Sequence, residues 1–117
     1  MILRQLTDEV SLKGINTINE SSIVNVPANT ETTVITLTAT VDHKIFRISV
    51  SGDDYAKYRL YIDTNLVETR RAGPQRTLDF IFNSPLLLTT GQILDIKVLH
   101  CFTGDQLDFE STIYSRV

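Results

Sequence analysis

Apolar and polar residues alternate along most of this chain, from Val34 to Ile113. The alternation is clearest at residues 57–63, 66–71 and 76–82, which are separated by short turn sequences. A period of two between turn residues is typical of half-buried antiparallel strands. The pattern therefore predicts an all-β fold. It carries no catalytic chemistry of its own.

About eight or nine strands are expected, each with one apolar face, and this suits an antiparallel two-sheet sandwich. A jelly-roll-like arrangement is the first choice, because that architecture has about eight strands in two packed sheets. The expected strands lie at residues 22–26, 32–41, 44–51, 56–63, 66–72, 76–83, 85–88, 92–102 and 105–115. Alternation predicts a core made of Ile35, Leu37, Ala39, Phe46, Ile48, Val50, Tyr58, Leu60, Ile62, Leu78, Phe80, Phe82, Leu94, Ile96, Val98, Phe109 and Ile113.

The first residues differ from the rest, because their apolar side chains are too sparse for an amphipathic helix. We interpret residues 1–20 as an extended N-terminal arm and residues 21–117 as the β-sandwich domain. The arm either lies along its own domain or reaches a neighbouring subunit, as added strands do at exposed sheet edges. In the second case Arg4 and Leu6 are candidate protein contacts.

Composition excludes several classes of function. The 11 basic and 14 acidic residues give a net charge of −3, which provides no general attraction to nucleic acid.

Cys101 is the single cysteine, so no intrachain disulfide forms and a reducing compartment is expected. The start lacks the features of a signal peptide, and no apolar run approaches the ~20 residues of a membrane span. The chain is expected to be cytosolic when made.

No catalytic or metal site is predicted, so we expect no enzymatic activity and no cofactor. His100 and Cys101 are neighbours on an expected strand, where their side chains leave opposite faces and cannot meet. One cysteine and two histidines exclude a structural zinc site. Two Gly-Asp loops remain open to either interpretation, as ordinary turns or as cation sites, at Asp53/Asp54 and at Asp105/Asp108.

Two groups of polar residues are candidate binding sites. Arg70, Arg71 and Arg76 flank a predicted hairpin turn, where they serve as a solvated edge, a contact for an acidic protein surface or, least favoured, a nucleic-acid contact. Tyr61 shares an outward face with Arg59, which suits either cross-strand packing or contact with a glycan.

Residues 32–115 resemble the small β-sandwich accessory proteins of tailed bacteriophages, which decorate capsids or tail parts. Three blocks carry the likeness: residues 46–52 running into 58–63, residues 70–74 followed by 78–80, and residues 86–98 closing with 108–113. The resemblance implies a non-enzymatic capsid decoration or cement protein, located in the virion and assembled in the host cytoplasm. It would bind the major capsid protein as a homo-oligomer, with a trimer favoured, and contact neither nucleic acid nor membrane. The alternative is a tail or baseplate accessory module that binds host-surface carbohydrate through Tyr61 and Arg59.

Overall fold

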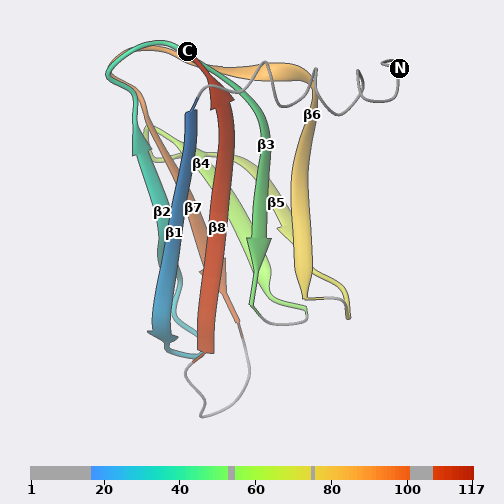
Figure 1. Cartoon of the computed structure of the whole chain (residues 1–117). Coiled ribbons are helices and arrows are strands. Elements are labelled where there is room, and N and C mark those ends of the chain that lie inside the picture. Colours follow the sequence, from blue (N-terminus) through green and yellow to red (C-terminus); the bar gives the residue numbers. More distant parts are fainter. Residues whose placement is uncertain (1–16, 53–54, 75, 101–106) are drawn as a thin grey trace, which may run out of the picture.

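The computed structural model describes residues 17–52, 55–74, 76–100 and 107–117, which form antiparallel strands in two layers (Figure 1). The strands are β1 (Thr17–Val26), β2 (Thr32–Thr38), β3 (His43–Ser51), β4 (Lys57–Ile62), β5 (Asn65–Arg71), β6 (Thr77–Leu88), β7 (Ile93–Leu99) and β8 (Leu107–Arg116). Sheet A has the order β1-β8-β3-β6, and sheet B has the order β2-β7-β4-β5. The predicted all-β sandwich is confirmed. No helix in the described part of the chain is long and apolar enough to cross a membrane.

The strands pair in nested order, as the two arms of one long hairpin would. β1 pairs with β8, β2 with β7, β3 with β6 and β4 with β5. Two further pairings, β3 with β8 and β4 with β7, join these units into the two sheets. The tip is the turn between β4 and β5, where Asp63 and Thr64 have φ angles of 51° and 68°. Two consecutive positive φ angles are typical of the two-residue hairpin turn that this segment predicts.

The core lies between the sheets and contains most of the predicted side chains. Tyr58, Phe80 and Phe109 are fully buried in it, and Ile62, Leu78 and Phe82 pack against it while partly buried. The prediction that Phe46 is buried with Ile48 and Val50 is wrong, because Phe46 is only partly buried.

A β-bulge explains the difference at Phe46. The register of β3 shifts between Ile45 and Arg47 against both neighbouring strands. An extra residue in a strand reverses the face on which the following side chains lie. Ile45 and Ile48 are therefore both buried, and Phe46 lies between them on the bulge.

Two strand boundaries differ from the expected ones. β1 begins at Thr17, so residues 17–20, expected in the arm, pair with residues 112–115 of β8. Residues 1–16, with Arg4 and Leu6, lie outside the described residues. β6 joins the two strands expected at 76–83 and 85–88. Pro85 is tolerated within it because β6 is an edge strand and its register with β3 skips residues 82–85, so the missing N–H donor breaks no ladder bond.

Candidate functional site

The outer face of sheet B carries a group of basic side chains. In the register of the sheet, Lys57 lies opposite Arg71, and Arg59 lies opposite Lys97. Directly opposite residues of antiparallel strands point to the same side of the sheet. Since Tyr58 is buried between Lys57 and Arg59, all four basic side chains face outward. They occupy two adjacent rows, which lie about 7 Å apart along a strand.

Glu31 organises the centre of this face. Arg59 Nη1 donates to Glu31 Oε2 at 2.9 Å, and the hydroxyl of Tyr61 donates to the same carboxylate at 3.1 and 3.2 Å. The hydrogen bond with Glu31 raises the pKa of Arg59 above its usual value. Lys97 Nζ lies 5.0 Å from the centre of the Tyr61 ring. A cation at this distance occupies the ring face that a sugar would need.

The three arginines predicted at the hairpin tip are separated in the structure. Arg70 faces the interior side of sheet B, where it forms an ion pair with Glu68 and lies 5.5 Å from the Phe80 ring. Its Nη1 also donates to the carbonyl of Asp79 at 3.3 Å, so it bridges β5 and β6. Neighbouring residues on a strand point to opposite faces, and Arg71 therefore points outward.

Arg71 and Arg76 are exposed, and each also contributes to local structure. Arg71 Nη1 donates to the carbonyl of Tyr55 at 3.0 Å. Arg76 has a φ angle of 64°, and its carbonyl accepts a hydrogen bond from Gly52 N at 3.1 Å. Arg71 thus belongs to the basic face of sheet B, whereas Arg76 belongs to a turn.

The outer face of sheet A separates its charges into two halves. The basic half consists of two rows, Arg116–Lys44–Leu87 and Ile18–Tyr114–Arg47–Ile81. The acidic half consists of the rows Glu20–Thr112–Ser49–Asp79 and Glu110–Ser51–Thr77. In the basic half, the guanidinium of Arg47 stacks 4.3 Å from the centre of the Tyr114 ring.

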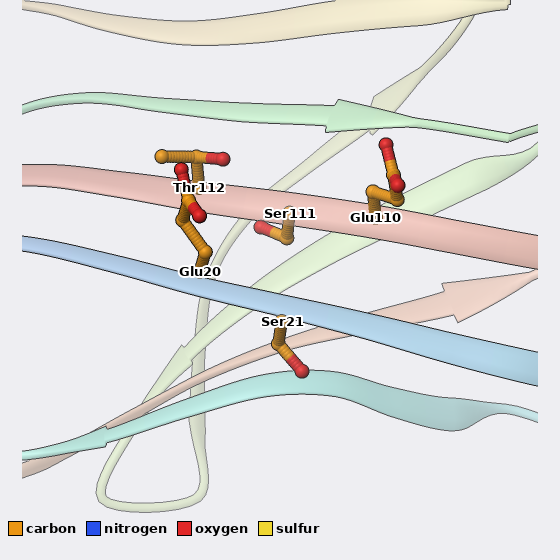
Figure 2. Close-up of a pocket in the computed structure, with 5 residues that line it drawn as sticks. All are labelled: Glu20, Ser21, Glu110, Ser111 and Thr112. Atoms are coloured by element: carbon orange, nitrogen blue, oxygen red, sulfur yellow. The ribbon is translucent and has the colours of Figure 1, made fainter.

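A pocket of about 410 Å³ opens in the acidic half (Figure 2). Its lining comes from the paired strands β1 and β8 and consists of Glu20, Ser21, Glu110, Ser111 and Thr112. The side chains of Glu20, Glu110 and Thr112 face the outer side of the sheet, whereas those of Ser21 and Ser111 alternate to the inner side. Within the described ranges, no group of three or more His, Cys, Asp and Glu residues is placed to hold a metal ion.

Both histidines are buried and hydrogen-bonded in the interior. His43 Nδ1 lies 3.0 Å from Ser115 Oγ, and His100 Nε2 lies 2.8 Å from the carbonyl of Val26. His100 also packs against the Phe109 ring. Cys101 and the candidate cation residues Asp53, Asp54 and Asp105 lie outside the described residues, while Asp108 is exposed on β8.

Together the fold and its faces define an antiparallel β-sandwich with two differently charged outer surfaces. No protein-family model matches the sequence, and no curated protein matches it. Among solved structures, the crystal structure of FLHE is similar, with a TM-score of 0.50 and 9% identity. The similarity covers 86% of this chain and 96% of that chain. At this identity the similarity shows the fold alone.

The expectation of a phage capsid decoration protein, with a tail accessory module as its alternative, is contradicted. The structural neighbour that was found is FLHE and not a phage capsid protein. The reason lies in the residues that carried the resemblance. Residues 86–98 form the end of β6, a turn and β7, and a leucine run followed by glycine and an alternating strand is common to many β-sandwiches.

The basic face of sheet B is not apparent from the sequence alone. Alternation places Lys57, Arg59 and Lys97 outward, but it does not show that they are neighbours. Their proximity depends on the pairing of β4 with β7, two strands that are far apart in the chain. The sequence therefore indicates that these three side chains face outward, but it does not indicate which strands lie side by side.

Proposed function

We propose that this protein is a non-enzymatic interaction module that binds an acidic protein surface on the outer face of sheet B. The observation that carries the proposal is the grouping of Lys57, Arg59, Arg71 and Lys97 in two adjacent rows. Glu31 and Asp95 neutralise part of this charge, and the face remains basic on a chain whose net charge is −3. Arginine forks and lysine ammonium groups are well suited to carboxylates.

The preordered centre of the face supports binding more than catalysis. Glu31 holds Arg59 and Tyr61 in place, so little side-chain entropy is lost there when a partner binds. Exposed Leu66 and Val67 on the adjacent strand β5 add apolar contact area. An acidic segment with some apolar residues is therefore the partner that we propose.

The test is binding of a fluorescein-labelled oligoglutamate peptide, measured by fluorescence anisotropy at two salt concentrations. We expect saturable binding that weakens with salt, because exposed charges are screened beyond about 8 Å at physiological ionic strength. The double variant Lys57→Glu/Lys97→Glu should weaken binding by about tenfold or more, because it places like charges against the peptide.

The matched control is Lys44→Glu/Arg116→Glu, which makes the same charge change on the outer face of sheet A. Equal losses for the two double variants would contradict the proposal. Tighter binding to a labelled single-stranded DNA oligonucleotide than to oligoglutamate would replace it with a nucleic-acid function.

We also propose that the sandwich is a jelly roll. The strand orders β1-β8-β3-β6 and β2-β7-β4-β5 support this assignment, because they arise when one long antiparallel hairpin folds over into two sheets. In this arrangement the outer faces of the two sheets point in opposite directions. They are therefore able to bind two different partners at once.

A further inference from the structure

Exposed apolar side chains gather on the basic half of the outer face of sheet A. Ile18, Ile81 and Leu87 are 53%, 61% and 61% exposed, respectively. Ile18 and Ile81 lie in one row with the stacked pair of Tyr114 and Arg47 between them. Apolar side chains that are grouped on one face, with charged residues around them, are typical of a protein contact.

The opposite charges on this face do not pair with one another within one molecule. The basic half has Lys44, Arg47 and Arg116, and the acidic half has Glu20, Asp79 and Glu110. None of these six side chains forms an ion pair with another residue in the described ranges. Arg116 and Glu110 are on the same strand, about 20 Å apart.

We propose that two copies of this chain pack together through the outer faces of sheet A. The two-fold axis lies in the interface and runs perpendicular to the strands. This axis places the basic half of each copy on the acidic half of the other, with Arg116 opposite Glu110 of the second copy. An axis parallel to the strands would instead place like charges together, which is unfavourable.

The charge pattern of the face is self-complementary, and this favours a second copy over an unrelated partner. A symmetric contact of this kind uses the same patch on both subunits and closes with two copies. The resemblance to phage accessory proteins implied a homotrimer. A symmetric contact that closes with two copies predicts a dimer instead. The dimer goes beyond the proposed function and does not depend on it, because sheet B takes no part.

The size of the face sets the expected strength of the dimer. With strands about 4.8 Å apart and rows about 7 Å apart, the four strands and four rows cover about 500 Å² per copy. The total of about 1,000 Å² lies at the low end of specific interfaces. We therefore expect a dimer that dissociates on dilution and weakens with salt.

Sedimentation velocity of the full chain over a range of concentrations tests this arrangement. The variants are Glu110→Arg, Arg116→Glu and the double variant that combines both changes. We expect each single reversal to raise the dimer dissociation constant by about tenfold or more. The double variant exchanges the two charges and should return the constant to within a few-fold of the original.

A second pair of variants tests the apolar contribution. Ile81→Ser should weaken the dimer, whereas Leu66→Ser, at a side chain that is 55% exposed on sheet B, should leave it unchanged. Circular dichroism checks that every variant is folded. A wild-type chain that stays monomeric at the highest concentration would overturn the proposal. A double variant without recovery would overturn it equally.

Discussion

Two serines on the buried face of β8 have different surroundings. Ser115 is fully buried, and its hydroxyl lies 3.0 Å from His43 Nδ1. Ser111 is 2% exposed, and its hydroxyl has no hydrogen-bond partner among the described residues. A buried polar group without a partner costs folding free energy, whereas a satisfied one contributes about 1 kcal/mol.

We therefore expect different effects from the same substitution at the two sites. Ser115→Ala should lower the free energy of unfolding by about 1 kcal/mol, because His43 loses its partner. Ser111→Ala should leave it unchanged or raise it by up to about 1 kcal/mol. Urea unfolding at neutral pH measures both values. Equal destabilisation by the two variants would contradict this account.

Single residues show what alternation reveals and what it leaves out. It correctly placed Tyr58, Phe80 and Phe109 in the core. It indicated only a turn at Gly52, yet a side chain there would approach Phe109 Cδ2 to 2.1 Å. That restriction comes from packing between residues distant in the chain, which a single sequence does not show.

At the scale of elements, one carboxylate links two connections at one end of the sandwich. Asp42 lies between β2 and β3, and its Oδ1 accepts hydrogen bonds from Thr90 N at 2.8 Å and Thr90 Oγ1 at 3.0 Å. Thr90 lies in the turn between β6 and β7. These two hydrogen bonds lower the pKa of Asp42 below its ordinary value of 3.8.

This lowered pKa gives a pH dependence with a definite sign. The unfolded chain binds a proton at Asp42 more readily than the folded chain. The stability that the ionised Asp42 contributes is therefore present above pH 3.8 and is lost as pH falls through the lowered pKa.

The variant Asp42→Asn tests this dependence, because it keeps an oxygen acceptor but does not titrate. The stability difference between wild type and Asp42→Asn should be constant near neutral pH and change in favour of Asn below pH 3.8. Urea unfolding between pH 2 and 7 measures it. A difference that is independent of pH would contradict the assignment.

Strand positions were predictable from the sequence, but irregularities within strands were not. The turn at Asp63 and Thr64 was indicated by residues that tolerate positive φ angles. The bulge at Phe46 has no such marker, because a bulge adds a residue without changing the apolar character of the strand. Similarly, Pro85 suggested a break between strands, whereas β6 continues through it at the sheet edge.

At the scale of the whole molecule, the two outer faces have distinct charge patterns. Sheet A has a basic half and an acidic half that complement each other, and sheet B has a basic face ordered around Glu31. The sandwich class follows from alternation, but these patterns depend on which strands pair. Pairings such as β1 with β8 join the two ends of the described chain, which local periodicity does not reveal.

We propose that sheet A joins two copies of the chain while sheet B stays free to bind an acidic partner. Sedimentation equilibrium with saturating labelled oligoglutamate tests both parts in one measurement. We expect an intact dimer that carries two peptides, because the two basic faces point away from the dimer interface. Dissociation of the dimer on peptide binding would contradict the claim, since it would show that the acidic peptide occupies the basic half of sheet A instead.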